Sequence, residues 1–175
     1  MPRKLKTIEI ERISVEEFHR AEKTPLVVVL DNVRSMYNIG SVFRTADAFR
    51  IEEVLLCGIT ATPPSNEIHK TALGAEESVE WKYFKDTIDA VDYLKKKGFL
   101  LCAIEQCDGS VMLNDFKIDS AQKYAVFMGN EVKGVQQSVI DECDVCIEIP
   151  QYGTKHSMNV SVTAGIVMWE FAMSR

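Results

Sequence analysis

The chain has 175 residues, of which 46% are hydrophobic and 26% charged, and this composition predicts one globular domain and excludes a disordered or fibrous chain. Its net charge of −6 argues, taken alone, against a nucleic-acid-binding protein, because the surface of such proteins is usually basic. We find no signal peptide and no apolar run long enough to span a bilayer, so we expect a cytoplasmic protein with no membrane partner.

Residues 1–24 are polar and predict a basic N-terminal arm followed by a short helix. Arg3, Lys4 and Lys6 make the arm basic. The helix is expected over Ser14–Ala21, with Ser14 as its N-cap and Glu17 at the capping-box position.

Six buried strands are predicted from short apolar or β-branched runs, at Leu26–Leu30, Val54–Cys57, Val79–Phe84, Phe99–Ile104, Ala125–Met128 and Cys146–Ile149. Helices are expected between and after them, at Ile39–Phe49 with Asn38 as its cap, Ile68–Leu73, Thr87–Lys97, Val135–Ile140 and a last helix that opens at Ser157. This alternation over residues 25–175 predicts an α/β fold, a mainly parallel six-stranded sheet with helices on both faces.

The last predicted helix differs from the others because it is apolar nearly all round. Such a helix is usually buried on every side. Its two polar residues, Ser157 and Asn159, are expected in the first turn, facing the loop that precedes the helix.

Five cysteines, an odd and widely spaced set, favour reduced thiols in the cytoplasm. Cys143 and Cys146 form one CxxC pair, but structural zinc needs four ligands, and no second pair of ligands is apparent. None of the three histidines has metal-ligand spacing with another. We therefore expect no metal.

Three polar, glycine-containing stretches follow predicted strands: Asp31–Arg44, Gly129–Gly134 and Gln151–Asn159. In parallel sheets, ligands bind outside the carboxyl ends of the strands, so we expect these stretches to converge on one crevice. The first strand is not followed by GxGxxG, and the chain has no GxxxxGK[ST] and no GxSxG. The sequence signatures of a dinucleotide site, a Walker-type phosphate site and a hydrolase elbow are therefore missing.

The same stretches carry NxGxxxRTADAF (Asn38–Phe49), MGNEVKG (Met128–Gly134) and IPQYGTKHSMNVSVTAG (Ile149–Gly165). In order and spacing they resemble the three motifs of the SpoU, or TrmH-type, RNA ribose 2′-O-methyltransferases of the SPOUT class. The resemblance covers roughly residues 25–173 and includes HKTALGAEESVEW between the first two motifs. Val132 and Arg50 depart from it, because each stands where the family often has glycine.

The resemblance implies a C-terminal trefoil knot, S-adenosylmethionine bound in that knot, and a homodimer whose site borrows a residue from the other subunit. The implied reaction transfers a methyl group to a ribose 2′-hydroxyl of tRNA or rRNA. Cofactor contacts would fall on Ile104, Met128, Gly129, Ile149, Gln151 and Met158. Catalytic positions would be Asn38, Arg44, Glu131, Ser157 and Asn159.

These residue types suit the implied chemistry. The family's proposed activator matches Arg44, but a neutral guanidine base is costly because free arginine has a pKa above about 12. We expect Arg44 to grip the adjacent phosphate and stabilise the developing alkoxide. Asn38, Ser157 and Asn159 can orient the ribose, and Glu131 can hold Arg44 or Asn38 in place.

Two alternatives remain open: a non-catalytic RNA-binding module of the same fold, and a base-modifying methyltransferase. Taken singly, Asn38 and Ser157 are also good helix caps, and Arg44 and Glu131 could be ordinary surface charges. The residues Arg34, Arg44 and Arg50 gather around one predicted helix and are the expected RNA contact. The short arm favours tRNA over rRNA.

Overall fold

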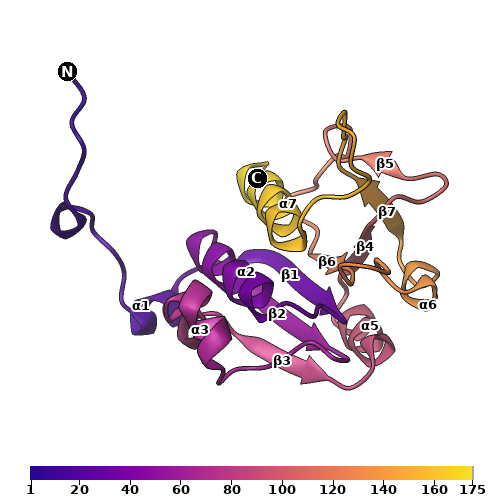
Figure 1. The fold of residues 1–175 in the computed structure, drawn as a ribbon, viewed down its shortest axis with the longest axis horizontal. Coiled ribbons are helices and arrows are strands. Elements are labelled where there is room, and N and C mark those ends of the chain that lie inside the picture. The colour runs from indigo at the N-terminus through magenta and orange to yellow at the C-terminus, as the bar shows by residue number, and fades with distance from the viewer. Residues whose placement is uncertain (175) are drawn as a thin grey trace.

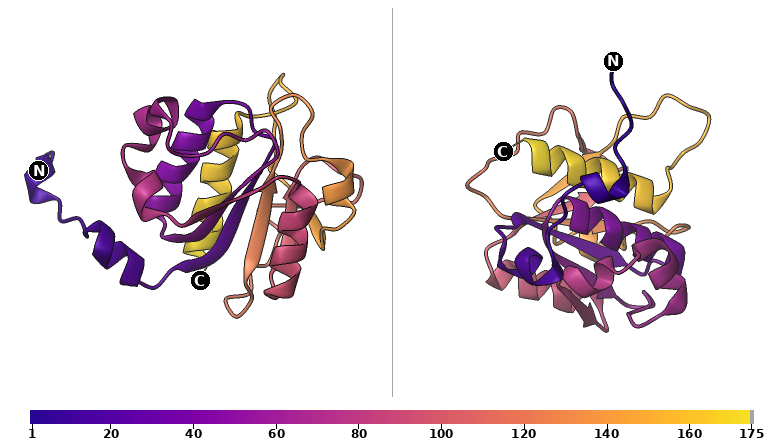
Figure 2. Two further views of the ribbon diagram at one scale, coloured as in Figure 1. Left: turned by 90° about the horizontal axis from the view of Figure 1, so that it is seen from below. Right: turned by 90° about the vertical axis from the view of Figure 1, so that its left-hand side faces the viewer.

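A computed structural model describes residues 1–174 as one parallel sheet with helices on both faces (Figures 1 and 2). The sheet order is β3-β2-β1-β6-β4-β7-β5, and every neighbouring pair is parallel. The strands are β1 (Thr24–Asp31), β2 (Ile51–Cys57), β3 (Trp81–Phe84), β4 (Leu100–Ile104), β5 (Val111–Met112), β6 (Tyr124–Met128) and β7 (Val145–Glu148). The predicted α/β fold with a parallel sheet is confirmed.

The predicted count of six strands is wrong, because β5 is a seventh. It has two residues, which is too short to show a periodic pattern in the sequence. It pairs only with β7 at the edge of the sheet, where Val111 lies opposite Ile147. The other six strands lie within a few residues of their predicted positions.

The helices are η1 (Thr7–Glu9), α1 (Val15–Arg20), α2 (Met36–Ala48), α3 (Asn66–Ala72), α4 (Ala75–Ser78), α5 (Thr87–Lys96), α6 (Gln137–Ile140) and α7 (Val160–Met173). Successive side chains of a strand point to opposite faces. Leu26, Val28 and Leu30 of β1 accordingly pack with α2, α3 and α7, whereas Val27 and Val29 pack with α5 and α6. The sheet is thus buried on both sides, as its continuous apolar strands predict.

The structure shifts two predicted helix starts. Ser35, not Asn38, caps α2, because the Ser35 hydroxyl accepts the amide of residue 38 at 3.3 Å. Asn159, not Ser157, caps α7 by accepting the Ser161 amide at 2.9 Å. The prediction for α1 is confirmed, with Ser14 and Glu17 forming the capping box.

After β7, which lies near one edge of the sheet, the chain crosses back, and α7 packs beside α2 and against β1 (Figure 2). Ala164, Val167, Met168 and Phe171 lie on its buried face. Its other face is exposed in the single chain, so the expectation of burial on every side is wrong there. That face carries Val162, Ile166, Trp169 and Met173, which are 37–54% exposed.

The N-terminal arm extends away from the sheet and its helices (Figure 1). Its side chains are almost all exposed up to Val15, and Phe18 of α1 is the first residue to enter the core. Among residues 1–174, no helix has the length and apolarity needed to cross a membrane.

Candidate active site at the carboxyl ends of the strands

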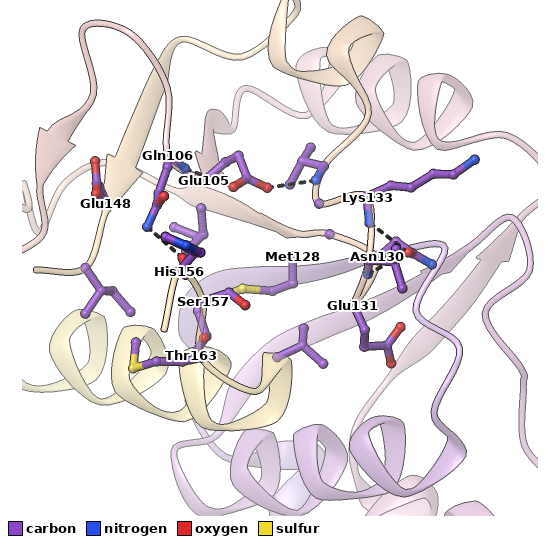
Figure 3. A pocket seen from close by; sticks show the side chains of 18 of the residues that line it. Glu105, Gln106, Met128, Asn130, Glu131, Lys133, Glu148, His156, Ser157 and Thr163 are labelled. Atoms are coloured by element: carbon purple, nitrogen blue, oxygen red, sulfur yellow. Dashed lines mark hydrogen bonds between the residues drawn. The ribbon is translucent and has the colours of Figure 1, made fainter. Parts of the chain in front are cut away.

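A cleft of about 750 Å³ opens at the carboxyl ends of β4, β6 and β7 (Figure 3). Its lining residues come from the ends of these strands and from the segments that follow them, within residues 104–106, 128–140 and 147–163. All six residues predicted to contact a cofactor line it, namely Ile104, Met128, Gly129, Ile149, Gln151 and Met158. Two of the three predicted stretches, Gly129–Gly134 and Gln151–Asn159, thus contribute lining residues directly. The third, Asp31–Arg44, contacts the cleft wall through the side chain of Asn38.

Close backbone packing shapes the wall that follows β6. A Cβ at Gly129 would lie 2.1 Å from the Gly134 carbonyl carbon and the Val135 nitrogen, so a side chain at 129 would force the loop apart. Asn130 and Gly134 exchange backbone hydrogen bonds of 3.0 and 2.9 Å across this turn. The turn can therefore close on itself only with a glycine at position 129.

Val132 does not disturb that loop, although the family often has glycine there. Its side chain is 78% exposed, and its φ angle is not positive. Its amide donates to the Asn130 side chain at 2.9 Å, as does the amide of Lys133 at 3.1 Å. The loop is therefore held by an Asx-type turn that does not require a glycine at this position.

A chain of hydrogen bonds joins three of the predicted catalytic residues at one end of the cleft. Asn38 Nδ2 donates to Glu131 Oε1 at 3.2 Å, and Asn159 Nδ2 donates to Asn38 Oδ1 at 3.1 Å. Asn159 Oδ1 in turn accepts from the Ser161 hydroxyl at 2.7 Å. Residues as far as 121 positions apart in sequence are thus brought together.

Glu131, in the loop that follows β6, places its carboxylate at the N-terminus of α2. Its two carboxylate oxygens accept the backbone amides of Arg34 and Ser35, each at 3.0 Å. Burial acts to raise the pKa of Glu131, but these amides and the Asn38 side chain outweigh burial, so its pKa lies below the ordinary value. The positive end of a helix favours a negative charge at this position. Glu131 therefore holds Asn38 and has no bond to Arg44.

Ser157 and Arg44 stand apart from this hydrogen-bond chain. Ser157 lines the cleft, and its hydroxyl bonds to no other group among residues 1–174. Arg44 is exposed on α2, is not part of the cleft wall, and makes no hydrogen bond or ion pair within the same residues. Four of the five predicted catalytic residues are therefore gathered at one cleft, and Arg44 is not.

The three arginines expected to bind RNA do not form one compact patch. Arg34 precedes α2, Arg44 lies on it, and Arg50 follows it. At about 1.5 Å per helical residue, Arg34 and Arg50 are on the order of 20 Å apart.

Sequence reasoning missed two residues that tie the cleft walls together. Glu105 Oε2 accepts the Val135 amide at 3.0 Å, and Gln106 Nε2 donates to the His156 carbonyl oxygen at 3.0 Å. Both directly follow β4, so their position at the carboxyl end of a buried strand was the available signal.

A third missed residue is Asp31, a fully buried carboxylate at the end of β1. It accepts the Thr87 hydroxyl at 2.6 Å and both the backbone and side-chain N–H groups of Gln136, at 2.9 and 2.8 Å. These bonds anchor the base of the loop that follows β6. Buried carboxylates need such partners, so its role here is structural.

The cleft has the features that a large, partly apolar cation requires. Ile140, Ile149 and Met158, which are partly exposed, provide apolar surface, and Gly129 and Gly134 line the same cleft. The charged side chains on its walls are mainly acidic, namely Glu105, Glu131 and Glu148 against Lys133. No group of three or more His, Cys, Asp or Glu side chains within residues 1–174 is arranged to hold a metal ion.

Comparison with known proteins agrees with this geometry. Residues 25–169 match the model of the SpoU rRNA Methylase family. The chain is 33% identical over 156 residues to the 23S rRNA (guanosine-2′-O-)-methyltransferase RlmB of Neisseria meningitidis, a match that covers 86% of the chain. It spans about three fifths of the length of the curated relatives that it matches, 59% in this case.

Solved structures show the same fold. An AdoMet-bound rRNA methyltransferase from Sinorhizobium meliloti superposes with a TM-score of 0.79 and 27% identity, covering 88% of this chain and 59% of that one. A TrmH/SpoU tRNA modifying enzyme from A. aeolicus superposes with a TM-score of 0.80 and 24% identity, covering 92% and 82%. The resemblance seen in the three motifs is thereby confirmed, and the chain belongs to the SpoU rRNA methylase family.

Proposed function

We propose that this chain is an S-adenosylmethionine-dependent RNA methyltransferase that acts in the cytoplasm on a ribose 2′-hydroxyl of tRNA or rRNA. The observation that carries the proposal is the hydrogen-bonded chain Glu131–Asn38–Asn159 beside a glycine-walled cleft. Two similar proteins support the reaction type by their names, one a guanosine-2′-O-methyltransferase and the other an AdoMet-bound methyltransferase. In this proposal residues 25–175 form the catalytic domain, and the basic arm of residues 1–24 contacts RNA.

The cofactor would lie in the cleft against Ile104, Met128, Gly129, Ile149, Gln151 and Met158. When bound, S-adenosylmethionine supplies an electrophilic methyl group on a cationic sulfur. The apolar part of the lining suits the uncharged parts of the cofactor, the backbone of the turn over residues 129–134 would bond to its polar edges, and the acidic lining suits its net positive charge.

The polar residues at the end of the cleft would position the ribose. Glu131 fixes the amide of Asn38 by accepting its N–H, and Asn159 donates to the oxygen of the same amide. Ser157, whose hydroxyl has no partner among residues 1–174, would bond to the ribose directly. Holding the attacking oxygen in line with the methyl group can supply much of the rate enhancement.

Arg44 would act on the other protomer of a homodimer. The exposed apolar face of α7 lies next to α2, since Trp169 packs edge-on against Phe49 with ring centroids 5.9 Å apart. A twofold contact through this face would bury its apolar surface and bring α2 of one protomer toward the cleft of the other. Arg44 would there grip the RNA phosphate and stabilise the developing alkoxide.

We also infer that the C-terminal segment is threaded into a trefoil knot. The connection between β5 and β6, residues 113–123, packs over α7 through Phe116, whose ring lies 6.1 Å from that of Phe171. α7 packs on the same face of the sheet against β1 and α2. The contact between this connection and the last helix supports the proposed threading, in which α7 would follow β7 through the loop formed by residues 113–123.

The test is methyl transfer from labelled S-adenosylmethionine to unmodified total RNA, which is then separated by size. We expect label in one size class and a loss of about 10²–10³-fold in rate for Arg44→Ala, the usual cost of removing one group that stabilises the transition state. Arg44→Lys keeps the charge but not the planar fork, so it should remain well below the wild-type rate. Absence of label in every class, despite measurable cofactor binding, would contradict transfer and favour an RNA-binding module.

The position of the methyl group distinguishes ribose from base. A 2′-O-methyl group removes the hydroxyl that attacks the adjacent phosphate, so the linkage that follows it resists alkaline cleavage. We expect the label in alkali-resistant dinucleotides. Label in single nucleotides would identify a base as the acceptor.

A further inference from the structure

Glu105 is a carboxylate that lines the cleft and has no cationic partner among residues 1–174. It directly follows β4, a central strand of the sheet, and its side chain is half-buried. It makes no ion pair with any of residues 1–174. Among residues 1–174, Lys133 is the one lysine that lines the cleft, and Figure 3 shows its side chain pointing away from Glu105.

The position of the Glu105 carboxylate is fixed by the backbone around it. Its Oε1 accepts the Gln106 amide and its Oε2 accepts the Val135 amide, both at 3.0 Å. Gly134 lies so close that a Cβ there would fall 2.1 Å from Oε2. The carboxylate is therefore held between the two loops that follow β4 and β6, and it cannot swing freely to solvent.

These hydrogen bonds do not neutralise the charge. Two neutral amides stabilise a carboxylate but leave its negative potential in the cleft, where low exposure to water reduces screening. A half-buried anion without a counter-ion favours any bound cation near it. Glu131 differs in this respect because it also faces the positive end of α2.

We propose that Glu105 is the residue that makes the cleft prefer the cationic sulfonium of S-adenosylmethionine over the neutral thioether of S-adenosylhomocysteine. This inference rests on the proposed function. Methyl transfer removes the positive charge from the cofactor sulfur, so the same carboxylate that retains the substrate cofactor does not retain the product cofactor. Glu105 is thus a specificity residue for the charge of the cofactor. It aids the replacement of S-adenosylhomocysteine by S-adenosylmethionine after each turnover.

The test is the ratio of two dissociation constants, measured by titration calorimetry on the full chain for S-adenosylmethionine and for S-adenosylhomocysteine. Glu105→Gln removes the charge and keeps the shape, although one of the two amides loses its acceptor. Loosening of the loops would raise the Kd of both ligands by the same factor, and this factor would cancel in the ratio. We expect Kd for S-adenosylmethionine to rise about tenfold more than Kd for S-adenosylhomocysteine, which corresponds to about 1.4 kcal/mol.

Two control variants locate the effect. Glu22→Gln makes the same charge change at an exposed site outside the cleft and should leave the ratio unchanged. Glu148→Gln removes another carboxylate of the cleft wall, one that accepts the Ser110 hydroxyl at 2.9 Å. A change in ratio for Glu148→Gln equal to that for Glu105→Gln would overturn the assignment to Glu105.

An unchanged ratio in Glu105→Gln would also overturn this inference, while binding of both ligands to the wild type would leave the proposed function standing. If the wild type binds neither ligand, the proposed function fails and this inference fails with it. Glu105→Ala provides the same comparison of ratios should the glutamine variant not fold.

Discussion

At the scale of single residues, the site depends on which of several polar side chains makes each contact. Ser35 and Asn38 are three positions apart, and Ser157 and Asn159 two, and every one of them is a residue type that caps helices. The sequence places the capping role on Asn38 and Ser157, but the structure gives it to Ser35 and Asn159. Local preference cannot decide between such neighbours. At α2, Glu131 makes Ser35 the cap, because it accepts the Ser35 amide and the Asn38 side-chain N–H from nearly a hundred positions away.

The six residues proposed to contact the cofactor were predictable for a different reason. Five of them belong to motifs whose order and spacing identify the family, the sixth, Ile104, ends the predicted strand β4, and all six line one cleft. Glu105 and Asp31 were missed because a single acidic residue after a strand has no distinctive pattern. Their partners, the amides of Val135 and Gln136, are identified only by three-dimensional contact.

The lowered pKa of Glu131 leads to a prediction about stability. A carboxyl group whose pKa is below its ordinary value of 4.5 in the folded state stabilises that state above this pH, and the stabilisation is lost as the pH falls through the folded-state pKa. We expect Glu131→Gln to lower Tm at pH 7 by about 2 °C, a small effect because the side chain is exposed. Thermal unfolding followed by circular dichroism at several pH values would measure it.

The difference in Tm between wild type and Glu131→Gln should shrink as the pH falls below 4.5. Glu11→Gln, a change at an exposed glutamate of the arm, serves as the control and should leave Tm unaltered at either pH. A Tm difference that persists undiminished at low pH would show that the ionised carboxylate is not what stabilises the fold.

At the scale of elements, α7 is the helix whose environment the sequence describes least well. A helix that is apolar on every side is usually buried, and this one is buried on one side only within a single chain. The remaining side is a compact row of Val162, Ile166, Trp169 and Met173. An apolar row of this kind on a family member proposed to dimerise fits an interface between two copies.

This row predicts the effect of a charged substitution. Trp169→Glu would place a carboxylate in the proposed dimer interface, where it has no partner, so we expect the dimer to weaken by at least about 100-fold, or about 2.7 kcal/mol. Sedimentation velocity over a range of concentrations would report the shift from dimer to monomer. Ile59→Glu makes a similar change at a residue 65% exposed in the turn after β2 and should leave the oligomeric state unaltered. A dimer that survives Trp169→Glu intact would place the interface elsewhere.

At the scale of the whole molecule, the sequence predicts the class of fold but not its topology. Continuous apolar runs such as that of β1 identify buried parallel strands. The order β3-β2-β1-β6-β4-β7-β5 cannot be read from such runs, because each is equally able to pair with any other. The two-residue β5 and the packing of α7 against Phe116 depend on contacts between distant segments in the same way.

The exposed position of Arg44 predicts complementation between two inactive variants. If Arg44 acts in the cleft of the other protomer, a mixed dimer of Arg44→Ala and Asn159→Ala contains one intact site and one doubly defective site. Random assembly after co-expression should then restore about a quarter of wild-type methyl transfer, since half of the dimers are mixed and each has one working site of two. Co-expressed variants with no more activity than either alone would place Arg44 in the cleft of its own chain.

The packing of α7 against β1 also sets the time at which this protein can fold during synthesis. Val160, at the start of α7, follows Leu30 of β1 by 130 positions, and both belong to the same core. At about 5–20 residues per second, a ribosome needs roughly 6–26 s to make the intervening chain. For that interval the apolar face of β1 lacks one of the helices that cover it, so α2 and α3 must shield that face until α7 has been made.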